Sequence, residues 1–109
     1  MFVVIFRARL RSPDSEYSVV AARLRELALT QFGCLHFHAV TEGRDEVALS
    51  YWPSEAAIVA WKSHPEHTLA QAAGRTRWYE SYSVQVAQLT REYCWDREPS
   101  TTGSSRKSD

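Results

Sequence analysis

The chain opens with a run in which every second residue is apolar. Residues 2–10 are rich in Val, Ile and Phe and are too few for a typical helix, so the pattern predicts a strand. Even-numbered positions of this run are all apolar. Odd-numbered positions are apolar at the start and become arginine at Arg7 and Arg9. Because side chains alternate across a strand, one face is expected to be buried along its whole length and the other only in part.

In the next segment apolar residues recur at helical spacing. One apolar stripe is predicted from Tyr17, Val20, Ala21, Leu24, Leu27 and Ala28. Ser12 is the expected cap, with Pro13 at the first helical position and Asp14 in the first turn. Gly33 is expected to end the helix, since glycine accepts the left-handed conformation common just after a C-terminus.

The next segment predicts a hairpin. Residues 34–41 alternate, with Leu35, Phe37 and Ala39 on one face and His36, His38 and Val40 on the other. Residues 42–45 are typical of a turn, and residues 46–52 are expected to return as the second strand.

A second helical region and a last strand complete the pattern. Pro53, Ser54 and Glu55 indicate a helix start, and the pair His64–Pro65 interrupts the helix because the residue before proline avoids the helical region. A further turn or two is expected from residue 66 to about 73, ended by Gly74. Residues 79 to about 89 alternate again as a strand.

The order strand, helix, strand, strand, helix, strand predicts an α+β fold of the ferredoxin-like, split βαββαβ type. Both helices would cover one face of a four-stranded antiparallel sheet. The other face needs a cover that this chain does not supply, which favours a homodimer in which two sheets meet. We expect residues 1–96 to form this domain, residues 91–95 to reach the partner subunit, and residues 97–109 to be a disordered tail.

Composition narrows the class of protein. Lys and Arg number 13, as do Asp and Glu, so there is no basic excess of the kind that nucleic-acid binding needs. No apolar run is long enough to cross a membrane, and the N-terminus lacks a signal-peptide pattern, so a cytoplasmic protein is expected. Cys34 and Cys94 lie far apart in no metal-like spacing and are expected to be free thiols.

Residues 50–62, read as SYWPSEAAIVAWK, continue through His64–Pro65–Glu66–His67 and Ala70–Gln71. This stretch resembles the antibiotic biosynthesis monooxygenase family, whose members are dimeric α+β barrels. Gly74–Arg75 and residues 78–82 strengthen the resemblance. It extends from the first predicted strand through the last.

The resemblance implies a cofactor-independent monooxygenase that acts on a small electron-rich, quinol-like aromatic held between helices and sheet. Haem is the alternative, as ligand or as substrate. Trp61 matches the family's Trp position. The family's Asn on the first strand has no counterpart, because the chain contains no Asn, and Phe6 or Arg7 stands there. The position of the haem-ligating His in haem-degrading relatives falls near Gln71.

Candidate site residues follow from this setting. Trp61, His67 and Arg75 are the expected catalytic residues: Trp61 would pack on the substrate, and His67 or Arg75 would hold an oxygen and stabilise negative charge. The expected substrate contacts are Phe6, Tyr51, His64, Gln71, Trp78 and Tyr82. Each has an alternative reading as a packing or surface residue, Trp61 above all as a core residue.

Four histidines allow a metal site to be considered. His36 and His38 share a strand face, and His64 and His67 could complete a ligand set. We expect no metal site, because the first pair should point towards the dimer side and away from the helices. The sequence also leaves a second function possible besides the oxygenase: a non-catalytic dimer that binds a small hydrophobic ligand.

Overall fold

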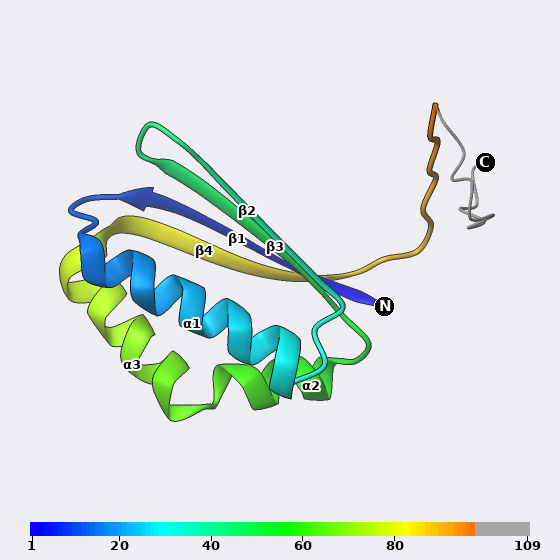
Figure 1. Cartoon of the computed structure of the whole chain (residues 1–109), viewed down its shortest axis with the longest axis horizontal. Coiled ribbons are helices and arrows are strands. Elements are labelled where there is room, and N and C mark those ends of the chain that lie inside the picture. Colours follow the sequence, from blue (N-terminus) through cyan, green and yellow to red (C-terminus); the bar gives the residue numbers. More distant parts are fainter. Residues whose placement is uncertain (98–109) are drawn as a thin grey trace.

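A computed structural model describes residues 1–97 of the chain. Figure 1 shows a sheet with helices packed along one side of it. The elements in chain order are β1 (Phe2–Leu10), α1 (Ser15–Gln31), β2 (His36–Glu42), β3 (Asp45–Trp52), α2 (Glu55–Lys62), α3 (Pro65–Ala73), a π-helical turn η1 (Gly74–Trp78) and β4 (Tyr79–Gln88).

The sheet has the strand order β2-β3-β1-β4, and every neighbouring pair in it is antiparallel. In the centre of the sheet Val4 lies opposite both Ser50 of β3 and Val86 of β4. The helices cover only one face of this sheet (Figure 1). The ferredoxin-like α+β fold predicted from the sequence is therefore confirmed.

The start of α1 differs from the sequence prediction. Asp14, not Ser12, is the cap: its backbone is extended, and its side chain accepts a hydrogen bond from the Tyr17 N–H at 2.9 Å. Pro13 therefore precedes the cap instead of opening the helix. The end of α1 is as predicted, since Gly33 has a φ of 80°.

The α3 helix ends at Ala73 with Gly74 as its cap, as predicted, but the chain does not leave the helical conformation there. Gly74 has helical dihedrals (φ −59°, ψ −47°), and the chain continues from α3 into η1. The glycine is needed for a different reason: a Cβ at this position would lie 2.7 Å from the ring of Tyr79. Gly74 thus permits a close approach between the turn and the first residue of β4.

Tryptophans dominate the core between helices and sheet. Trp52 and Leu27 are fully buried, and Trp61 packs beside Trp52 with ring centroids 5.1 Å apart. The Trp52 indole N–H donates to Ser50 Oγ at 2.8 Å, so the polar atom of this side chain is satisfied.

The opposite face of the sheet has no cover among residues 1–97. Its central strands carry Val3, Ile5, Val47, Leu49 and Tyr51, all half-exposed. The chain after β4 runs beyond the sheet (Figure 1), with Tyr93 and Trp95 exposed. The expected disordered tail lies outside the described residues except for Arg97.

The structure also bears on the cysteines and on membrane-spanning helices. Cys34 and Cys94 are free cysteines. None of the helices within residues 1–97 is both long and apolar enough to cross a membrane.

Candidate active site

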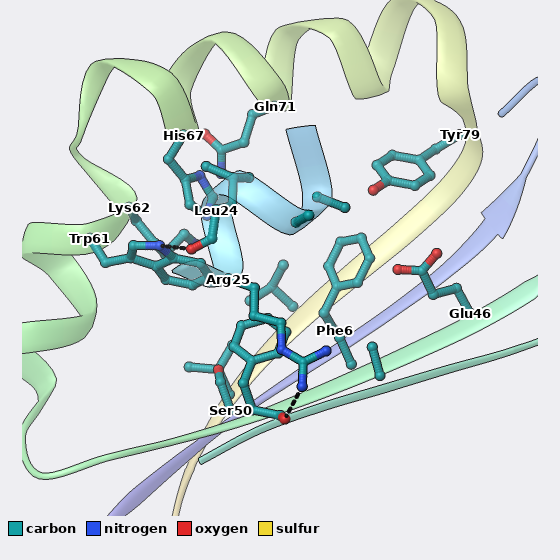
Figure 2. Close-up of a pocket in the computed structure, with 17 residues that line it drawn as sticks. Phe6, Leu24, Arg25, Glu46, Ser50, Trp61, Lys62, His67, Gln71 and Tyr79 are labelled. Atoms are coloured by element: carbon teal, nitrogen blue, oxygen red, sulfur yellow. Dashed lines mark hydrogen bonds between the residues drawn. The ribbon is translucent and has the colours of Figure 1, made fainter. Parts of the chain in front are cut away.

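A cavity of about 400 Å³ lies between the helices and the covered face of the sheet. Its wall is mostly apolar and draws on every strand and on three helices. Figure 2 shows Trp61 and His67 on one side, Tyr79 and Glu46 on the other, and Phe6 between them. The alternation of β1 and β3 explains the wall, because Val4, Phe6, Ala48 and Ser50 all project to the same face. The volume is that of a site for a small organic molecule.

Trp61 belongs both to the core and to the cavity wall. It is buried, and its indole N–H donates to the Leu24 carbonyl at 3.1 Å (Figure 2). With its N–H occupied, Trp61 offers a ligand only its ring.

His67 stands edge-on against Trp61, with ring centroids 4.4 Å apart. Burial lowers the pKa of His67, and nearby Lys62 and His64 lower it further, so the ring is neutral at pH 7. Its Nδ1 is buried and has no hydrogen-bond partner within residues 1–97. A buried N–H without an acceptor is less well tolerated than a bare acceptor nitrogen. We therefore assign the proton of the neutral ring to Nε2, from which His67 would donate one hydrogen bond.

Tyr79 closes the opposite side of the cavity, and its hydroxyl points inward (Figure 2). The Tyr79 hydroxyl donates to the Tyr17 hydroxyl at 3.4 Å. Tyr17 in turn donates to Oε1 of Glu46. Burial raises the pKa of Tyr79 to about 12. Burial also raises the pKa of Tyr17, with the bond to Glu46 as the next cause, so both phenols stay protonated near neutral pH.

Two cations border the cavity. Arg25 donates to the Phe37 carbonyl at 3.2 Å (Figure 2), and its guanidinium lies 5.6 Å from the centroid of the Phe37 ring. Lys62 lies at the His67 side. The polar groups therefore form two clusters separated by apolar wall.

Four of the residues expected in the site line this cavity: Phe6, Trp61, His67 and Gln71. Leu69 of α3 is 70% exposed and does not line the cavity, so this side chain does not fill the space beside Trp61.

The other five expected residues lie elsewhere. Tyr51 is on the uncovered face of the sheet beside His36, because its odd position on β3 points away from the helices. His64 caps α3, with Nδ1 accepting from the Glu66 N–H at 3.1 Å. Arg75 donates to the Tyr82 hydroxyl at 3.1 Å, and neither residue lines the cavity.

Trp78 is also separate from the cavity wall. It is buried, and its indole N–H donates to Asp14 Oδ1 at 3.2 Å. The Tyr17 ring meets it edge-on at 5.2 Å. Trp78 thus supports Tyr17 from behind.

Glu46 is the site residue that the hydrophobic pattern does not single out. The signal was present in the register: Glu46 has the same parity on β3 as Ala48, Ser50 and Trp52, which all face the helices. A carboxylate at an inward-facing position needs a hydrogen-bond donor, and Tyr17 supplies it.

The histidines do not assemble a metal centre. His36 and His38 lie on the uncovered face of the sheet, whereas His64 and His67 lie on the helix side. Residues 1–97 contain no group of three or more His, Cys, Asp or Glu side chains placed to hold a metal ion.

The structure is that of an α+β protein with an open, mostly apolar cavity between its sheet and helices. A family model described as antibiotic biosynthesis monooxygenase matches residues 1–73. The chain is 41% identical over 93 residues to the uncharacterized protein YqjZ of Bacillus subtilis, covering 84% of this chain and 81% of that protein. The chain therefore belongs to the antibiotic biosynthesis monooxygenase family.

Other similar proteins share less sequence with this chain. Jasmonate monooxygenase ABM of Pyricularia oryzae is 32% identical over 94 residues, which cover 83% of this chain but only 44% of that protein. SnoaB, a cofactor-independent oxygenase from Streptomyces nogalater, has a similar structure, with a TM-score of 0.70, 16% identity, and coverage of 84% and 94% of the two chains. Rv0793 of Mycobacterium tuberculosis matches with a TM-score of 0.71 and 19% identity over 84% and 96%. At such identities the structural matches establish the shared fold.

Proposed function

We propose that the protein is a cofactor-independent monooxygenase that oxidises a small electron-rich, quinol-like aromatic in the cavity beside Trp61. The observation that carries the proposal is the open cavity of about 400 Å³ with a mostly apolar wall and the neutral His67 in it. SnoaB is a cofactor-independent oxygenase and the Pyricularia oryzae protein is a jasmonate monooxygenase, which supports the same reaction class for this chain.

The overall reaction needs no separate reductant. A quinol and dioxygen give a hydroxyquinone and water: one oxygen atom is inserted into a ring C–H bond as a hydroxyl, the other takes the two quinol O–H hydrogens and leaves as water, and the quinol supplies all four electrons. His67 would hold a substrate oxygen through its Nε2–H and stabilise the negative charge that grows as the quinol loses a proton to solvent. Trp61 would pack on the aromatic ring. Arg75 is placed beside Tyr82, so we assign the oxygen contact to His67.

Oxygen uptake with 1,4-dihydroxynaphthalene tests this proposal. The wild-type protein should accelerate uptake above the rate in buffer, and labelled dioxygen should leave one labelled atom in the product. His67→Ala should lose at least tenfold in rate, since one hydrogen bond to developing charge is removed. Thr68→Ala, the next and exposed residue of α3, is the matched control and should retain the wild-type rate. Oxygen uptake at the buffer rate with the wild-type protein would reject the oxygenase in favour of a non-catalytic binding protein.

Haem is the alternative substrate, because His67 offers an imidazole in the cavity wall. A haem titration separates the two. A shift of the Soret band that His67→Ala abolishes, followed by loss of the band with ascorbate and oxygen, would replace the quinol by haem.

We also propose that the protein works as a homodimer joined through the uncovered face of the sheet. Half-exposed Val3, Ile5, Leu49 and Tyr51 lie side by side there, and apolar sheet faces of this kind normally meet a partner. Residues 91–95 would add Tyr93 and Trp95 to the contact. Sedimentation equilibrium tests this, and a monomer at micromolar concentration would contradict it.

A further inference from the structure

The second polar cluster of the cavity is a hydrogen-bond chain with a fixed direction. Its members come from three elements: Glu46 from β3, Tyr17 from α1 and Tyr79 from the start of β4. Glu46 and Tyr79 line the cavity, and Tyr17 links them from behind the wall.

The direction follows from the number of protons. A carboxylate only accepts hydrogen bonds, so the single proton of the Tyr17 hydroxyl is committed to Glu46. The Tyr17 oxygen can then only accept from Tyr79, whose own single proton is thereby committed to Tyr17. What Tyr79 presents to the cavity is an oxygen lone pair.

Packing holds the Tyr79 ring in this place. Phe6 lies 5.5 Å from it and Tyr82 lies 5.6 Å from it, measured between ring centroids. The Tyr17 ring stands perpendicular to it at 5.8 Å. The ring also lies against Gly74, where a Cβ would be only 2.7 Å from Tyr79 Cε2. Because these neighbours already confine the Tyr79 ring, little side-chain entropy of Tyr79 is lost when a ligand binds.

We propose that the Glu46–Tyr17–Tyr79 chain makes the Tyr79 oxygen a dedicated acceptor and so selects substrates that carry a hydroxyl group at this end of the cavity. The inference rests on the proposed function, since it concerns the same cavity. It adds the orientation of the substrate. His67 lies at the other side of the cavity from Tyr79 (Figure 2). With Nε2–H as the donor there, the preferred ligand is an aromatic alcohol whose hydroxyl faces Tyr79 and whose second oxygen, an acceptor, faces His67.

Calorimetric titration with 2-naphthol and with 2-methoxynaphthalene tests the inference. The two compounds have the same apolar body and both can accept a hydrogen bond, but only 2-naphthol can donate one. Wild-type protein should bind 2-naphthol about five- to tenfold more tightly, the worth of one neutral hydrogen bond. Tyr79→Phe should bring the two affinities to about the same value by weakening 2-naphthol alone.

Tyr17→Phe and Glu46→Gln test the chain itself. In Tyr17→Phe the Tyr79 proton is released from its partner and can turn towards the cavity. In Glu46→Gln the amide can donate to Tyr17 and reverse the direction of the chain. Both variants should therefore bind 2-methoxynaphthalene more tightly than wild type does and lose most of the preference for 2-naphthol. Their circular dichroism spectra should match the wild-type spectrum.

The outcomes are separable. Equal wild-type affinities for the two compounds, or a preference that survives Tyr79→Phe, would overturn the inference and leave the ligand site in place. Failure of both compounds to bind wild-type protein would overturn the inference together with the ligand cavity on which the proposed function rests.

Discussion

The two faces of the sheet are built from the same strands but have different surroundings. The covered face carries Trp52 and the cavity wall, which includes the polar residues Glu46 and Ser50. The uncovered face carries Ile5, Leu49 and Tyr51 without any cover among residues 1–97. Under the proposed function, this difference assigns ligand binding to the first face and contact with a second subunit to the other.

Trp61→Ala should disturb the covered face most. Trp61 packs on Trp52 and His67 and donates its N–H to the Leu24 carbonyl, so its loss leaves a large hole in the core and removes that hydrogen bond. We expect the free energy of unfolding to fall by about 3–5 kcal/mol in urea denaturation. Val59→Ala, which truncates a 62% exposed neighbour on the same helix, should stay within about 0.5 kcal/mol of wild type. A loss below about 1 kcal/mol for Trp61→Ala would mean that the residue is not part of the core.

Leu49→Arg should disturb the uncovered face. Leu49 lies opposite Ile5 on one side and His38 on the other. A charge in the middle of the proposed subunit contact would be buried without a partner, so the dimer dissociation constant should rise by about 100-fold. Light scattering at graded concentrations measures the shift. Val19→Arg, at an exposed position on α1, is the control that should leave the mass unchanged.

Gly74→Ala sharpens the account of the cavity's Tyr79 side. The new Cβ would lie 2.7 Å from Tyr79 Cε2, so the ring must move. We expect a loss of about 1–3 kcal/mol in the free energy of unfolding. In a Tyr79→Leu background the same substitution should cost much less, and a double-mutant cycle measures the coupling. Additive effects would show that the close approach does not matter.

The pH dependence of stability tests the state of His67. Its pKa is lower in the folded protein than the ordinary value of 6.5, so below that pH the unfolded chain binds more protons than the folded one. Stability should therefore be fully present above pH 6.5 and fall as the pH drops from there towards the lowered pKa, by at most about 1.4 kcal/mol per pH unit. His67→Gln should flatten this part of the profile. If the pH–stability profiles of wild type and His67→Gln coincide over this range, the assignment is contradicted.

Sequence patterns predict most of the fold and part of the site. The alternation of β1 and β3 predicts the wall residue Phe6, and helical spacing predicts the buried Leu27 and Ala28. Spacing alone does not show which residues of different elements meet. Tyr51 is aromatic and close in sequence to Trp52, yet its parity sends it to the uncovered face. The Glu46–Tyr17–Tyr79 chain joins three elements, so only the packed structure reveals it.

Two neighbouring residues of β3 give the most direct test of the central claim. Ala48 faces the cavity, and Leu49 faces the uncovered side. The measurement is the affinity for 2-naphthol by calorimetry, taken with the molar mass of the same sample. Ala48→Phe, which fills the cavity, should abolish binding and keep the dimer, whereas Leu49→Arg should give a monomer that still binds 2-naphthol. Wild-type affinity in Ala48→Phe, or loss of binding and of the dimer together in both variants, would contradict the separation of ligand and partner between the two faces.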